Sequence, residues 1–157
     1  MLQLADDIDG VGSSVDLTGT TGIQTVLGGA YEDTLIAGTS GVTLQGWNGS
    51  PSANASSDTF QGGSGADLFV LGDAVGNAYG HGDTAVARIY GFDATKDKIQ
   101  LHDFGTIHAG SAGYQTRSGA PGEVDIFTYA GTGEAQHVAS VQISRGTFDW
   151  TKDISLI

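Results

Sequence analysis

The sequence contains no cysteine, only two prolines, and six lysine and arginine residues against 18 aspartates and glutamates. Without cysteine the chain can form neither a disulfide framework nor a thiolate metal site. The net charge of −12 argues against nucleic acid and anionic membrane surfaces as partners, because phosphate contacts need clustered lysine and arginine. No apolar run approaches the roughly 18 residues that a membrane-spanning helix needs, so we expect no membrane insertion.

Catalytic and targeting motifs are also missing. The histidines at 81, 102, 108 and 137 show neither H-x-H nor H-E-x-x-H spacing, which argues against a zinc protease. Neither G-x-S-x-G nor G-K-[ST] is present, so the sequence predicts no hydrolase elbow and no phosphate loop. Carboxylate pairs suited to glycoside chemistry stay open, although cation binding explains the carboxylates better. The segment MLQLADDIDG lacks the features of a secretory signal. We therefore expect a protein that is not an enzyme.

Glycine, in contrast, is abundant, with 26 residues, and it punctuates a nine-residue repeat between Gly10 and Val70. Six apolar residues occupy the eighth place of successive segments: Leu17, Val26, Leu35, Leu44, Phe60 and Phe69. Two segments, Gly28–Ile36 (GGAYEDTLI) and Gly62–Val70 (GGSGADLFV), read as a glycine turn, an aspartate and a short apolar strand. This is the nonapeptide pattern G-G-x-G-x-D-x-U-x, which is typical of a calcium-bound parallel β-roll.

The repeats predict a single all-β domain over residues 1–157. Each repeat has room for one tight turn and one short strand, which buries its apolar side chain only by stacking on its neighbours. We expect a short parallel β-roll over residues 10–70, capped by antiparallel strands over residues 71–157, because an uncapped stack exposes its interior and an unpaired edge. Seven extra residues between Gly49 and Asp58 should form a surface excursion.

The aspartates in this frame predict a calcium site. Two nonapeptides make one coil, so the segments that begin at Gly28 and Gly46 should stack on one edge and bring Asp33 and Asp58 together. Calcium prefers six to eight oxygen ligands, which carboxylates and turn carbonyls supply. The alternative is that Asp33 and Asp58 cap their turns by hydrogen bonds to the backbone.

A second site is expected on the opposite edge, where the sixth places of the repeats hold Gln24, Val42 and Asp67. Asp67 would need partners from the chain that follows, with Asp73 and Asp83 nearest in sequence. The full set of predicted metal-site residues is Gly28, Ala30, Glu32, Asp33, Gly46, Asn48, Asp58, Gly62, Ser64, Asp67, Asp73 and Asp83.

Three segments carry a resemblance to a known family. They are GGSGADLFVLGD at 62–73, RIYGFD at 88–93 and DKIQL at 97–101. Together they resemble the C-terminal module of RTX exoproteins, which also ends serralysin-type proteases, haemolysins, alginate epimerases and cyanobacterial surface proteins. The resemblance covers residues 62–101 best and fades beyond 105. Tyr31, Trp47 and Gly91 depart from the family pattern, so we expect only about one to three calcium ions.

The resemblance implies calcium-driven folding outside the cell after export by a type I machinery, and the ending DISLI is similar to its C-terminal signal. The predicted function is a non-enzymatic calcium-binding folding and secretion module of a larger secreted or cell-surface bacterial protein. The alternative is an accessory module for extracellular polysaccharide or another surface, suggested by four aromatic residues: Trp47, Tyr79, Tyr90 and Tyr114.

Overall fold

The computed structural model describes residues 1–4, 10–49, 56–81, 85–105, 113–129 and 134–157, which form an all-β structure, as predicted. Its strands are β1 (Leu2–Gln3), β2 (Ser14–Asp16), β3 (Thr25–Gly29), β4 (Thr34–Ile36), β5 (Thr43–Trp47), β6 (Thr59–Gln61), β7 (Leu68–Val70), β8 (Ala87–Asp93), β9 (Lys98–Leu101), β10 (Tyr114–Ser118), β11 (Glu123–Thr128), β12 (Gln136–Arg145) and β13 (Ile154–Leu156). One helical turn, α1 (Trp150–Asp153), precedes β13. No helix in the described segments is long and apolar enough to cross a membrane.

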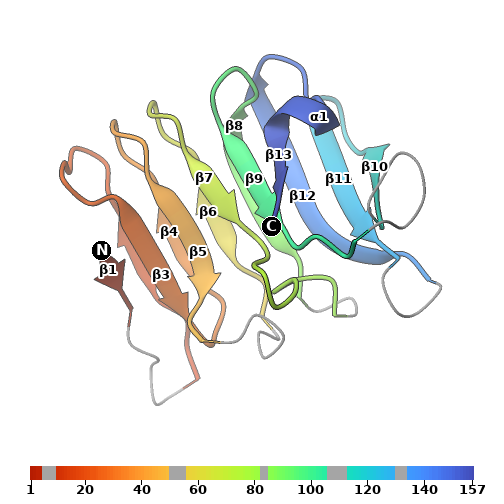
Figure 1. Ribbon diagram of the computed structural model, residues 1–157. Coiled ribbons are helices and arrows are strands. Elements are labelled where there is room, and N and C mark those ends of the chain that lie inside the picture. The colour runs from red at the N-terminus through yellow and green to blue at the C-terminus, as the bar shows by residue number, and fades with distance from the viewer. Residues whose placement is uncertain (5–9, 50–55, 82–84, 106–112, 130–133) are drawn as a thin grey trace.

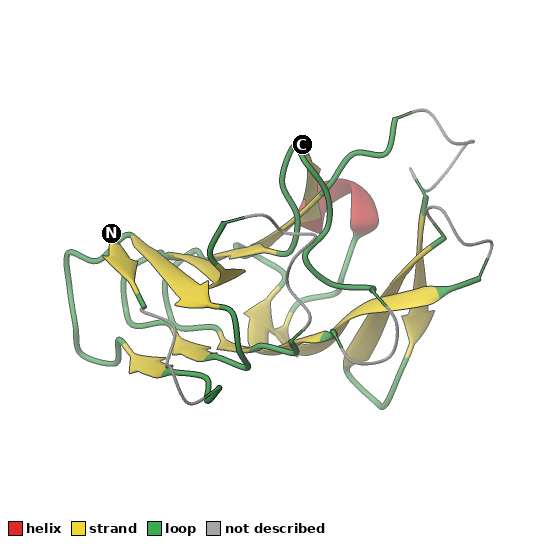
Figure 2. Cartoon of the chain, turned by 90° about the horizontal axis from the view of Figure 1, so that it is seen from below, coloured by secondary structure: helices red, strands yellow, loops and turns green. Residues whose placement is uncertain are grey.

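The strands form two sheets, seen as two layers in Figure 2. One sheet has the order β1-β3-β5-β7-β9-β13, and the other has the order β10-β11-β12-β8-β6-β4-β2. From β1 to β9, each strand lies in the opposite sheet to the strand before it. Figure 1 shows these strands side by side in chain order, from red at the N-terminus to green. The chain thus adds one strand to each sheet in turn, and each turn connects the two layers.

The register of the parallel strands follows the nine-residue frame. Thr25 pairs with Thr43 and Leu44 pairs with Phe69, so segments two repeats apart lie side by side. The apolar residues of the eighth place point into the space between the sheets, where Val26, Leu35, Leu44, Phe60 and Phe69 are fully buried. Apolar contact between stacked strands therefore holds the two layers together, as the frame predicts.

The first repeat departs from the predicted frame. Val15, and not Leu17, is the residue that pairs with Leu35. A shift of two residues keeps the same face of a strand toward the interior, so Leu17 is still only 5% exposed. Alternation alone cannot distinguish registers that differ by two residues, which is why the frame misplaced this strand.

The antiparallel cap predicted for residues 71–157 is correct only for part of that region. The pairs β10–β11 and β11–β12 are antiparallel. In contrast, β8 pairs in parallel with β6 and β12, and β9 pairs in parallel with β7 and β13. Ile89 lies beside Phe60 and Ile99 beside Phe69, so the apolar columns continue beyond Val70. The repeat becomes invisible in the sequence there because the connections lengthen, while the strand edges still require partners.

Candidate functional site

The turns that connect the sheets line two edges of the molecule, and both edges carry buried aspartates. We call the turns that lead into β2, β4 and β6 the first edge, and those that lead into β3, β5, β7, β9 and β13 the second edge. An aspartate directly precedes the strand at several of these turns, and each one is at most 2% exposed. They are Asp33 and Asp58 on the first edge, and Asp67, Asp97 and Asp153 on the second.

On the first edge the two aspartates lie in successive coils, as predicted. The Asp33 carboxylate accepts hydrogen bonds from the N–H of Gly29 (2.6 Å, to Oδ2) and of Ser13 (2.6 Å, to Oδ1). Oδ1 of Asp58 accepts a hydrogen bond from the N–H of Asp33 (2.8 Å), and the Tyr79 hydroxyl donates to Oδ2 of Asp58. Each carboxylate therefore joins its own turn to a neighbouring segment. The alternative interpretation, that these aspartates cap their own turns, matches the bond from Gly29 to Asp33, while the other three bonds come from other segments.

Close stacking of the turns explains the glycine requirement on this edge. A Cβ at Gly28 would lie 2.3 Å from the Gly46 carbonyl oxygen and 2.4 Å from Oδ2 of Asp33. A Cβ at Gly12 would lie 1.6 Å from the Glu32 carbonyl oxygen. Any side chain at these positions would force the turns apart, so carbonyl oxygens and carboxylates crowd against the bare backbone of the adjacent coil.

The second edge repeats the same two-donor pattern. Asp67 accepts hydrogen bonds from the N–H of Gly63 (2.8 Å) and of Val42 (3.1 Å). Asp97 accepts hydrogen bonds from the N–H of Asp93 (2.9 Å) and of Asp67 (2.9 Å). The residue that joins Asp67 to the following coil is therefore Asp97, which the sequence analysis did not name as a partner.

Of the two predicted partners of Asp67, the structure describes only Asp73. Asp73 accepts hydrogen bonds from the N–H of Val75 (2.7 Å) and of Gly76 (3.2 Å), and so closes its own turn. Asp83 lies outside the described residues. Sequence distance was a poor guide here, because the coil that stacks on Asp67 begins thirty residues later.

A hexapeptide repeat on this edge was missed by the sequence analysis. F-D-x-T-K-D occurs at residues 92–97 and again at 148–153. In each copy the first aspartate accepts the N–H of the threonine, at 2.9 Å for Asp93 and 3.0 Å for Asp149. The second aspartate accepts the N–H of the first, and that bond is 2.8 Å for Asp153. The identical letters, 56 residues apart, were the signal that could have located both turns.

The lysine of each copy reaches the turn of another coil. The Lys96 ammonium donates to the carbonyl oxygens of Gly65 (2.5 Å) and Gly63 (3.3 Å), and lies 3.9 Å from Oδ2 of Asp93. The Lys152 ammonium donates to the carbonyl oxygen of Ala94 (3.3 Å). These ammonium groups take turn carbonyls and a nearby carboxylate as partners, which are the oxygen ligands that a hard metal ion would use.

The second edge has one more ammonium close to an aspartate. Lys98 lies 3.8 Å from Oδ1 of Asp153, a buried oxygen that has no hydrogen-bond partner in the described segments. In the preceding coil the corresponding oxygen of Asp97 accepts the N–H of Asp67. Among the described residues, Lys98 therefore lies near the Asp153 oxygen that has no backbone N–H donor, whereas the equivalent oxygen of Asp97 has one.

The stretch of chain that forms the first edge contains no lysine or arginine. All lysines and arginines of the chain lie at residue 88 or later, whereas ten of the 18 acidic residues lie in 1–87. On the first edge Glu32 precedes Asp33 and Ser57 precedes Asp58, at the place that Lys96 and Lys152 occupy before Asp97 and Asp153. Among the described residues, no basic side chain lies within ion-pair distance of Asp33. Buried negative charge thus accumulates on this edge without a lysine or arginine nearby in the chain.

Protonation equilibria also differ within the second edge. Burial raises the pKa of the Asp97 carboxyl, and the hydrogen bonds from Asp67 and Asp93 oppose this effect only in part. The hydrogen bond from the Thr95 hydroxyl lowers the pKa of Asp93, and the Lys96 ammonium lowers it further. The turn therefore favours the ionised form at the outer aspartate and disfavours it at the buried one.

The donor atoms of the first edge suit a calcium ion if backbone carbonyls provide most of the ligands. A carboxylate oxygen that accepts one N–H keeps a second lone pair, so the Asp33 carboxylate, which accepts one N–H at each oxygen, retains acceptor capacity. A hollow of about 360 Å³ lies on the same edge, lined by Gly10, Val11, Gly12, Tyr31, Glu32 and Ser56; neither aspartate lines it. Nowhere in the described ranges do three or more histidine, aspartate or glutamate side chains gather as a metal site.

The other predicted ligands fall into two groups. Ala30, Glu32 and Asn48 are exposed in the first-edge turns, while Gly28 and Gly46 are buried near the ends of β3 and β5, which lead into those turns. Gly62 and Ser64 belong to the second-edge turn whose carbonyl oxygens bind Lys96. Lysine therefore already occupies carbonyl oxygens beside the second-edge candidates, and calcium binding at either edge stays a prediction.

The four aromatic residues that suggested a ligand surface are mostly core residues. Trp47, Tyr79 and Tyr114 are at most 2% exposed. Trp47 and Tyr79 meet edge to face with ring centroids 6.1 Å apart. Tyr90 alone among the four is exposed, at 40%.

A scan against models of protein families gives no match to this chain, and a search among curated proteins finds no matching sequence. The resemblance to RTX modules therefore rests on the sequence motifs alone.

Proposed function

We propose that this chain is a non-enzymatic calcium-binding module whose two sheets form the flanks of a short parallel β-roll. In this proposal it is the C-terminal folding and secretion part of a larger secreted or cell-surface bacterial protein. One observation carries the proposal: the first edge stacks the buried carboxylates of Asp33 and Asp58 in a stretch of chain without lysine or arginine.

The comparison with the second edge indicates what kind of partner would suit the oxygen atoms of the first edge. On the second edge, lysine ammonium groups bind turn carbonyl oxygens and lie near carboxylates. The first edge offers the same oxygen donors with no lysine or arginine from its own stretch of chain. A divalent cation from solution would neutralise the carboxylates and draw the turns together. Calcium is favoured over magnesium because it accepts many carbonyl ligands in irregular geometry and loses its water more readily.

Binding of this kind fits export in an unfolded state. Negative charge concentrated on one edge opposes folding until a cation arrives, since a ligand that binds only the folded chain stabilises it by mass action. Type I export would deliver the chain to a calcium-rich exterior, where the first edge could close. The ending Ile154–Leu156 forms β13 beside β9, so in this proposal the C-terminal signal becomes a strand after export.

Thermal unfolding in calcium, magnesium and chelator tests the proposal. Calcium at about one hundred times its Kd stabilises a protein by about 2.7 kcal/mol, which is about 5 to 10 °C in Tm for a chain of this size. Magnesium should have little effect. Asp33→Asn and Asp58→Asn should each reduce the calcium response, and the double variant should add little more because both carboxylates serve one ion. Equal Tm values in calcium and in chelator would contradict the proposal.

A further inference from the structure

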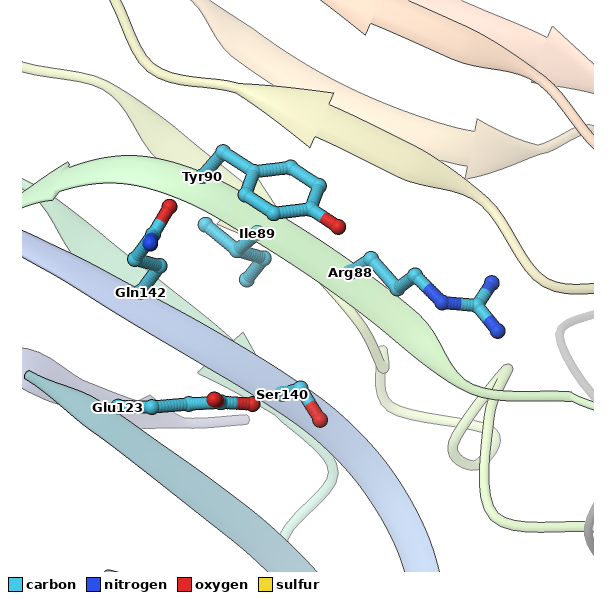
Figure 3. A pocket seen from close by; sticks show the side chains of 6 residues that line it. All are labelled: Arg88, Ile89, Tyr90, Glu123, Ser140 and Gln142. Atoms are coloured by element: carbon cyan, nitrogen blue, oxygen red, sulfur yellow. The ribbon is translucent and has the colours of Figure 1, made fainter. Parts of the chain in front are cut away.

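The outer face of the seven-stranded sheet carries a hollow unrelated to the turn edges. It has a volume of about 200 Å³ and is lined by Arg88, Ile89, Tyr90, Glu123, Ser140 and Gln142. Arg88 and Tyr90 belong to β8 and alternate with buried Ile89; Ser140 and Gln142 come from β12, and Glu123 comes from β11 (Figure 3). Arg88 lies opposite Ser140, and Gln142 lies opposite Glu123. These side chains therefore share one surface of three adjacent strands.

The hollow presents polar groups of opposite kinds that the protein leaves unused. Within the described segments, the side chains of Arg88, Glu123 and Gln142 form no hydrogen bond or ion pair. Together they offer a guanidinium donor, a carboxylate acceptor, and an amide that both donates and accepts. Figure 3 shows Gln142 reaching from β12 toward β8, and Glu123 reaching from β11 toward Ser140. Such a set suits a ligand with many hydroxyl groups, each of which donates and accepts.

The Tyr90 ring adds an apolar surface beside these groups. It is 40% exposed, and Figure 3 shows it lying along β8 at the rim of the hollow. An exposed tyrosine ring combines a flat apolar face with a polar tip, and such residues often dominate the binding energy of a site. A sugar ring, with its C–H face and its hydroxyl rim, matches both parts.

Neighbouring side chains hold the floor of this surface in place and extend it. The Ser140 hydroxyl donates to Oδ1 of Asp125 (2.7 Å), and Nε2 of His137 lies 3.3 Å from the same oxygen. This grouping is not a hydrolytic relay, in which the serine and the carboxylate contact different ring nitrogens. Phe127 continues the strip, stacked by His137 with ring centroids 4.7 Å apart and covered by the Arg117 guanidinium at 4.3 Å.

From these observations we infer that the outer face of β8, β12 and β11 binds an uncharged oligosaccharide through Tyr90, Arg88, Glu123 and Gln142. The net charge of −12 repels polyanionic chains, while the single positive charge of Arg88 and the single negative charge of Glu123 leave the hollow itself without net charge. The hollow is open and smaller than the roughly 300 Å³ at which enclosed cofactor pockets begin, which suits part of an extended chain. The site is independent of the proposed calcium edge.

An array of neutral and anionic oligosaccharides, followed by calorimetry with the best neutral one, tests this inference on the full chain. Tyr90→Ala should lower the affinity about tenfold, and Glu123→Gln and Gln142→Ala should lower it less. Tyr31→Ala is the matched control, because Tyr31 is 37% exposed and lies on the first edge. Melting curves in calcium and in chelator show whether each variant folds and keep the result separate from the calcium proposal.

Three outcomes would overturn the inference. The first is no binding of any neutral oligosaccharide by a folded sample. The second is a preference for anionic oligosaccharides. The third is an equal loss of affinity in Tyr31→Ala and Tyr90→Ala. A loss confined to Tyr90→Ala, with unchanged melting, would support it.

Discussion

The two edges of the molecule form similar aspartate turns but differ in the charged residues around them. Both use a buried aspartate to accept turn amides, as at Asp33 and at Asp97. The second edge adds lysines whose ammonium groups bind turn carbonyl oxygens, whereas residues 1–87 contain no lysine or arginine. The difference teaches that the same aspartate turn forms both beside lysines and in a stretch of chain that contains none. In our calcium proposal, the source of the cation, and not the turn itself, decides whether folding depends on the medium.

Alanine at Asp58 and at Asp97 should give the largest effects and separate the two edges. Asp58→Ala removes the acceptor of the Asp33 N–H, and Asp97→Ala removes the acceptor of the Asp67 N–H. An unpaired buried amide costs about 2 to 3 kcal/mol, so urea unfolding in chelator should show a similar loss for both. Only Asp58→Ala should also abolish the calcium response. An equal calcium response in the two variants would break the comparison.

Removal of the Lys96 ammonium should have a moderate effect on stability and should make its turn responsive to calcium. Lys96→Ala leaves the carbonyls of Gly63 and Gly65 without their donor, and about 1 kcal/mol of stability should be lost in chelator because the lysine is partly exposed. Part of this loss should return in calcium, since the carbonyl oxygens and Asp93 become available to a metal ion.

Lys96→Arg provides the control, because it keeps the charge and the donors. It should lose less stability than Lys96→Ala and should gain no calcium response. A loss in Lys96→Ala that calcium leaves unchanged would show that this turn is not a cation site.

A lysine placed on the first edge should raise stability in chelator and make the chain less responsive to calcium. Glu32→Lys introduces an ammonium at the position that corresponds to Lys96 and removes one exposed carboxylate. We expect a gain of about 0.5 kcal/mol in chelator and a smaller rise of Tm on adding calcium. Glu32→Gln removes the charge without adding a cation, so it should fall between the native chain and Glu32→Lys. A larger calcium response in Glu32→Lys would contradict the equivalence of the two turns.

The smallest expected effect concerns the pH dependence of the second edge. Hydrogen bonds from the Thr151 hydroxyl and N–H lower the pKa of Asp149, so the folded state prefers the ionised carboxylate. This contribution is fully present above the ordinary pKa of about 3.9 and disappears as the pH falls through the lower folded pKa. The Tm difference between the native chain and Asp149→Asn should therefore be present at pH 6 and shrink toward pH 3. A difference that grows on acidification would show the opposite sign of shift.

The nine-residue frame predicted part of the core and part of the first edge, but not the lysine contacts of the second edge. The nine-residue frame located Val26, Leu35, Leu44, Phe60 and Phe69 in the core and placed Asp33 and Asp58 on one edge, because a fixed period leaves one stacking arrangement. It failed at Val15, where a two-residue slip preserves the pattern, and beyond Val70, where the connections vary in length. The lysine contacts could not be predicted from local spacing, because Lys96 and Gly65 are 31 residues apart.

Phe60 pairs with Leu35 although the two residues are 25 positions apart in the sequence. Two uninterrupted nine-residue repeats would separate them by only 18 positions. The hydrogen bond between Asp33 and Asp58 also spans 25 positions. The coil therefore tolerates a change of length between Trp47 and Asp58 without loss of register, which agrees with the slow growth of loop-closure entropy with length. This position is a natural graft point: foreign peptides of moderate length inserted after Asn48 should be displayed on a scaffold whose strands remain aligned.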